Sequence, residues 1–101
     1  MRGRVTRTGY GPSQRAINIG GEHFYERLEY KGQWVAIHDY HKDKEGEWCV
    51  GYVPFDVASE IRTGGDHWTI ESWDPLTLSP SLLCRTCGNH GFIRRGVWVP
   101  A

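Results

Sequence analysis

The chain has 101 residues and no net charge, with five Trp, five Tyr, three Phe, thirteen Gly and five Pro. This length suits one domain with a single small core, and the frequent Gly and Pro exclude long helices. No segment approaches the roughly 20 apolar residues of a membrane span, and Met1 to Tyr10 lacks the apolar core of a signal peptide. We therefore expect a cytoplasmic protein in which the three cysteines stay reduced.

The charges are unevenly distributed along the chain. Residues 16–75 carry five basic and twelve acidic side chains, a net charge of −7, whereas residues 76–101 carry three Arg and no acid. Gly- and Pro-rich residues 1–21 are predicted to form a basic, flexible or extended arm, followed by a domain over 22–101. The arm could contact the phosphates of a nucleic acid through its four arginines: Arg2, Arg4, Arg7 and Arg15.

Strands are predicted first from alternation and turn signals. Residues 22–30 favour a strand, and Lys31-Gly32 predicts a turn. Residues 33–40 alternate with apolar side chains on both sides, which is typical of a central strand. A charged loop over 41–47 and a return strand over 48–53 complete a hairpin.

The second half of the chain is predicted to be less regular. Residues 56–62 favour a helix of about two turns, with Asp56 as its N-cap and Gly64 beyond its end. A strand is expected over 67–72. Pro75 and Pro80 prevent residues 73–83 from being one central strand, so we expect an extended segment over the core. Residues 91–99 predict a closing hairpin around 94–96.

A candidate metal site organises this half. Cys84, Cys87 and His90 supply two thiols and an imidazole within seven residues. Zinc prefers such donors and is usually held by four of them when its role is structural. The sequence therefore predicts a small β-rich single domain, mostly of antiparallel strands with one short helix near 56–62, stapled by a zinc-ribbon-like site.

The fourth ligand has to come from elsewhere in the chain. His67 follows a Gly-Gly-Asp turn that could aim its imidazole, and we favour it. Cys49, on a buried or half-buried strand position, is the alternative, and a water molecule would leave the site open. A redox pair of Cys84 and Cys87 is disfavoured because that motif should begin a helix.

A second site at the rim of the first hairpin is also conceivable. His38, Asp39 and His41 lie close together in the sequence and could bind a metal or transfer a proton. Strand alternation, however, sends Asp39 to the opposite face from His38. A solvated strand end is the simpler interpretation.

The C-terminal third resembles a family of small proteins that occur in actinobacterial phages and in bacteria and have no assigned function. The resemblance rests on Leu78-Ser79-Pro80-Ser81, on Cys87-x-x-His90, and on Phe92-Ile93 followed by Gly96. It implies that Cys87 and His90 are ligands and that the Ser-Pro-Ser run is structural. Some relatives are similar to proteins encoded beside bacterial ubiquitin-like conjugation systems, which implies protein interaction. An upstream Cys-x-Cys cluster of many relatives is absent here.

Three classes of function compete. The favoured one is a zinc-binding protein-interaction module, plausibly phage-encoded, whose partner would be contacted by Arg and Trp side chains: Arg94, Arg95, Trp98 and Trp73. The second is a nucleic-acid-binding protein that uses the arm. A structural or assembly protein of a virion is a further alternative to the favoured class. An enzyme is not expected, since the His-x-Glu of zinc deaminases is absent.

Overall fold

The computed structural model describes residues 4–8, 11–56 and 66–101, with backbone alone for 4–8. These ranges contain strands and no helix. The strands are β1 (Arg4–Thr8), β2 (Ile17–Gly20), β3 (His23–Tyr30), β4 (Gln33–Lys42), β5 (Trp48–Pro54), β6 (Thr69–Trp73), β7 (Leu76–Ser79), β8 (Leu82–Leu83), β9 (His90–Arg94) and β10 (Val97–Pro100). The predicted β-rich, antiparallel fold is confirmed. The helix expected over 56–62 lies, apart from Asp56, outside the described residues.

The larger layer is a five-stranded antiparallel sheet in the order β1-β5-β4-β3-β2. Its centre is the β3–β4–β5 meander that alternation predicted. Lys31 and Gly32 make the β3–β4 turn with φ of 51° and 78°, a left-handed conformation that glycine adopts readily. β4 continues to Lys42, two residues beyond the predicted end, so His41 belongs to the strand. The segment expected as an arm contributes the edge strands β1 and β2.

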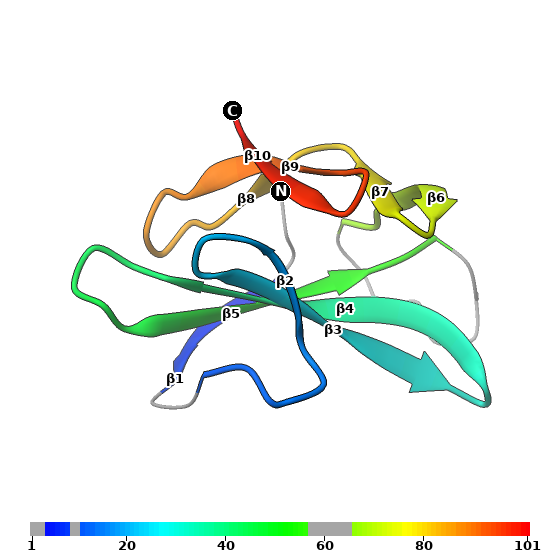
Figure 1. Ribbon diagram of the computed structural model, residues 1–101, viewed down its shortest axis with the longest axis horizontal. Coiled ribbons are helices and arrows are strands. Elements are labelled where there is room, and N and C mark those ends of the chain that lie inside the picture. The colour runs from blue at the N-terminus through cyan, green and yellow to red at the C-terminus, as the bar shows by residue number, and fades with distance from the viewer. Residues whose placement is uncertain (1–3, 9–10, 57–65) are drawn as a thin grey trace.

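A second, smaller layer lies over one face of this sheet (Figure 1). It consists of a three-stranded sheet, β10-β9-β8, and the β6–β7 hairpin. The backbone N–H of Gly96 donates to the carbonyl of Leu76 at 2.8 Å and joins the two pieces. As predicted, residues 73–83 are not one strand: β7 and β8 are separate, with Pro80 between them.

The core lies between the two layers. Alternate residues of β3, β4 and β5 face the second layer, and this face of the sheet is called the inner face below. The buried cluster combines them with side chains of the second layer, and its members are Ile19, Tyr25, Ile37, Val53, Phe55, Trp68, Leu76, Leu78, Leu82 and Ile93.

The described ranges contain no helix of the length and hydrophobicity that crossing a membrane requires.

Candidate metal centre

One end of the inner face carries a row of polar side chains. The strand register places His23 opposite His41 and His41 opposite Cys49, so β3, β4 and β5 each contribute one residue. All three are buried, with exposed fractions of 4%, 2% and 0%. Directly opposed residues of neighbouring strands lie on the same face of a sheet. The row therefore points towards the second layer.

A tight turn of the second layer meets this row. Cys84 follows β8, and its carbonyl accepts a hydrogen bond from the N–H of Gly88 at 2.7 Å. The N–H of Cys84 in turn donates to the carbonyl of Asn89 at 2.8 Å. Gly88 has φ of +81°, a conformation that a Cβ would strain. These constraints fold residues 84–89 into a turn that brings Cys84 and Cys87 to the same point.

Four donor atoms converge between the layers. The sulfurs of Cys49, Cys84 and Cys87 and a ring nitrogen of His41 all lie within 4.8 Å of one another. The Cys87 Sγ to His41 Nε2 distance is 3.3 Å, and none of the three cysteines is in a disulfide. Sulfurs that share a tetrahedral zinc lie about 3.8 Å apart. A small contraction of this His41/Cys49/Cys84/Cys87 cluster would therefore suit one metal ion.

The three thiols hold their protons very differently. Burial, reinforced by the sulfurs of Cys84 and Cys87, raises the pKa of Cys49 to about 12. Burial acts in the same direction on Cys84, but hydrogen bonds from the Cys87 backbone and from His41 outweigh it and lower the pKa of that thiol to about 7. The pKa of Cys87 is raised, chiefly by burial. Without a metal, Cys84 is thus the first thiol to ionise and opposes ionisation of the other two.

Behind the cluster, Asp39 links the two buried histidines. Its Oδ1 lies 2.6 Å from His23 Nε2 and 3.5 Å from His41 Nδ1, and it is fully buried. A metal-bound histidine usually gives its other ring N–H to a carboxylate, which fixes its tautomer and orientation. Asp39 is placed to do this for His41, whose Nε2 faces the sulfurs. Trp98 of β10 covers the far side by stacking on His23, with ring centroids 3.9 Å apart.

The predicted ligands fall into two groups. Cys84 and Cys87 meet as expected, and Cys49, the alternative to His67, joins them. His90 and His67 are not members of the cluster in the described part of the chain. His90 opens β9 and is exposed because Gly91, its neighbour in the strand, is the residue that points inwards. Its Nε2 lies 2.9 Å from Ser81 Oγ.

His41 is the member of the cluster that the sequence interpretation did not place correctly. The prediction of a charged loop over 41–47 is wrong at this position, because His41 lies in β4 opposite Cys49. In the rim group, Asp39 and His41 share the inner face, whereas His38 is half-buried on the other face, as alternation predicted for Asp39 and His38. A signal was available in the sequence. His41 and Cys49 flank the short hairpin loop, and residues at corresponding positions on either side of such a loop become neighbours when the strands pair.

The residues proposed to contact a partner lie in different environments. Arg94 and Arg95 are exposed at the β9–β10 turn, and the Arg94 guanidinium lies over the Phe92 ring at 4.1 Å. Trp73 is 43% exposed at the end of β6. Trp98 is half-buried against His23, so much of its ring faces the core.

Comparison with known proteins finds no family model that matches the chain, and no curated protein or solved structure of significant similarity. The resemblance to small phage and actinobacterial proteins therefore stays a prediction.

Replacing the buried carboxylate should weaken metal binding. Asp39→Asn removes the charge that orients the His41 ring, and we expect the affinity for Co²⁺ to fall by about 10–100-fold. Competition with a chelator, followed through the thiolate-to-cobalt absorption, measures it. Asp66→Asn, the same change at an exposed position, should leave the affinity unaltered. Equal affinities for both variants would contradict the role of Asp39.

Metal binding should release protons, because it requires thiolates where the metal-free protein holds thiols. With pKa values of about 7 for Cys84, about 12 for Cys49 and a raised value for Cys87, about three thiol protons leave below pH 7 and about two above it. The apparent affinity should therefore rise with pH. Calorimetry in buffers of different ionisation enthalpy counts the protons, and release of fewer than about one would contradict the cluster.

Proposed function

We propose that the protein is a small binding module whose fold is held together by one structural zinc ion at His41, Cys49, Cys84 and Cys87. The observation that carries this proposal is the convergence of four protein donors from both layers within 4.8 Å. Four protein ligands complete a tetrahedron, and such closed sites are typical of structural zinc.

The chemistry of the donors favours zinc over other ions. Three sulfurs and one imidazole are soft to intermediate ligands, which exclude the oxygen-preferring Mg²⁺ and Ca²⁺. No acidic side chain belongs to this group of four donors. Copper(I) and iron share the preference for thiolate, so metal content has to be measured on the purified protein.

A metal at this point would connect two parts of the chain that belong to different layers. His41 and Cys49 belong to the loop end of the β4–β5 hairpin, and Cys84 and Cys87 belong to the β8–β9 turn of the second layer. In Figure 1 both the hairpin loop and the turn lie at the left-hand end of the molecule. Small domains often need such a staple, because one small core contributes little stability.

The same geometry argues against catalysis at the metal. Cys49 and Cys84 are completely buried, and the four protein donors leave no ligand position for a reacting water. We therefore propose binding as the activity, with a protein as the partner. Support comes from exposed apolar and basic side chains near the β9–β10 turn: Trp73, Val97, Arg94 and Arg95.

Binding of nucleic acid and a role in a virion remain predictions from the sequence. The side chains of Arg2, Arg4 and Arg7 lie outside the described residues. Arg15 is exposed.

Metal analysis of purified protein and variants tests the proposal. We expect about one zinc per chain, lost in His41→Ala and in Cys49→Ser, since either change leaves three ligands. His67→Ala and His90→Ala serve as matched controls and should retain zinc. Chelation of the native protein should lower its melting temperature by more than about 10 °C, because binding energy contributes to folding.

Two outcomes would contradict the assignment. Zinc that persists in both His41→Ala and Cys49→Ser, but is lost in His67→Ala and His90→Ala, would move the site to the other histidines. A chain that binds no zinc, yet melts at the same temperature with and without chelator, would remove the staple altogether.

A further inference from the structure

The outer edge of β3 is paired along part of its length only. β2 pairs with His23, Phe24 and Tyr25, and its first residue is Ile17 opposite Tyr25. β3 continues to Tyr30 and pairs with β4, with a register shift between Leu28 and Glu29 where the extra residue, Val35, belongs to β4. In the ranges that the structure describes, residues 26–30 thus have a strand on one side and none on the other. Such an edge is a template for strand addition.

The chain before β2 does not extend the pairing. It turns away at residues 13–16, where the N–H of Ala16 donates to the carbonyl of Ser13 at 3.1 Å. The N–H and hydroxyl of Ser13 both bond to the Glu26 carboxylate at 3.0 Å, which ties this turn to the beginning of the open edge. Beyond it lies a groove of about 450 Å³, lined by Arg15, Ile17, Glu26, Arg27, Leu28 and Glu29.

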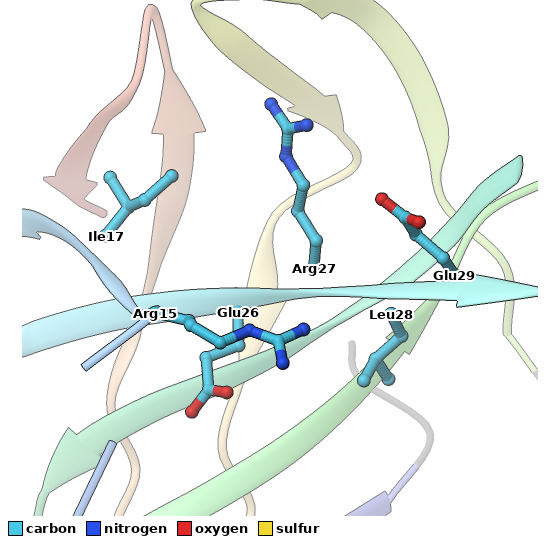
Figure 2. Close-up of a pocket in the computed structure, with 6 residues that line it drawn as sticks. All are labelled: Arg15, Ile17, Glu26, Arg27, Leu28 and Glu29. Carbon is cyan, nitrogen blue, oxygen red and sulfur yellow. The ribbon is translucent and has the colours of Figure 1, made fainter. Parts of the chain in front are cut away.

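The side chains of the edge alternate in charge and direction. Figure 2 shows Arg27 and Glu29 extending from one side of β3, and Glu26 and Leu28 from the other. Arg27 and Glu29 are exposed, and Leu28 between them is half-buried. Opposite charges two residues apart on one face become directly opposed when an antiparallel strand of the same sequence pairs about Leu28.

We propose that this edge binds a second copy of the chain, with the two β3 strands antiparallel about a two-fold axis at Leu28. Arg27 of each copy then lies opposite Glu29 of the other, and the two Leu28 side chains meet on the opposite face. The two sheets of five strands become one continuous sheet. The proposal does not depend on the identity of the metal.

Three further features suit this occupant. An isologous contact about a two-fold axis closes on itself, so it consumes the open edge without leading to fibres. The exposed apolar residues Ile17 and Tyr30, at 43% and 42%, lie at the two ends of the open edge and would be covered in part. The Arg27 guanidinium lies over the Trp34 ring at 4.2 Å. A stacked guanidinium can still donate from its rim to a carboxylate.

A second copy fits better than an unrelated extended peptide, because the edge is complementary to itself. Any strand could use the backbone groups of residues 26–30. Charged residues on an edge select against strands that lack matching charges. Pairing of Arg27 with Glu29 twice about one axis is a match that the chain itself supplies.

Charge exchange tests the register on the metal-loaded, full-length protein. Sedimentation equilibrium over a range of concentrations should show a dimer for the native chain. Arg27→Glu and Glu29→Arg each place like charges opposite each other twice, and each should weaken the dimer at least about tenfold. An equimolar mixture of the two variants restores both attractive pairs and should form a heterodimer, as should the double variant with itself.

The mixture also distinguishes lost charge pairing from misfolding, because a variant that fails to fold would not form a heterodimer with the other variant. Glu45→Arg makes the same change of charge in the loop at the far end of β4 and should dimerise like the native chain. A native protein that stays monomeric throughout would overturn the proposal. So would a dimer that both single variants leave intact, or single variants whose mixture stays monomeric.

Discussion

The convergence of three thiols and an imidazole between the two layers is the constraint on which this structure depends. Cys84 and Cys87 are fixed by their own turn, but His41 and Cys49 reach them only when the β4–β5 hairpin is in register and the second layer is docked on the inner face. A metal can therefore bind all four donors only when the β4–β5 strands are correctly paired and the second layer is correctly docked. In a chain of 101 residues with one small core, this pairing and this docking make up a large share of the tertiary structure.

The buried polar side chains beside the cluster follow from the same constraint. An aspartate and two histidines in the interior would be costly if they served no partner. Asp39 lies against both rings, and the ring of Trp98 closes the group from the second layer. With a metal on His41, the carboxylate balances positive charge and holds the ring in place. In the proposed site, the polar row on an otherwise apolar face would serve to orient His41.

Sequence reasoning reached the local features and missed those that depend on pairing. The Cys84-x-x-Cys87 turn and the β3–β4–β5 meander follow from short-range spacing and alternation, and both are present. His41 and Cys49 become neighbours through strand register alone, and a hairpin loop drawn two residues too early hides that relation. His90 was attractive because it is close in sequence to Cys87, yet the direction of β9 turns its side chain outwards. The strand face on which a side chain lies was therefore a better guide to the members of the cluster than its distance along the chain from Cys87.

The open edge of β3 shows the same dependence on register. Arg27 and Glu29 look like ordinary surface charges in the sequence. Their complementarity emerges because β2 begins beside Tyr25 and leaves the next five residues of β3 without a strand on that side in the described structure. The metal cluster and this edge occupy opposite ends of the long hairpins. In the two proposals, the cluster joins the two layers of one chain, and the edge joins the sheets of two chains.

X-ray absorption at the zinc edge of the native, metal-loaded protein tests the central claim most directly, because it counts donors by element. We predict three sulfurs at about 2.3 Å and one nitrogen at about 2.0–2.1 Å. A shell of two sulfurs with two nitrogen or oxygen donors would contradict the His41/Cys49/Cys84/Cys87 site.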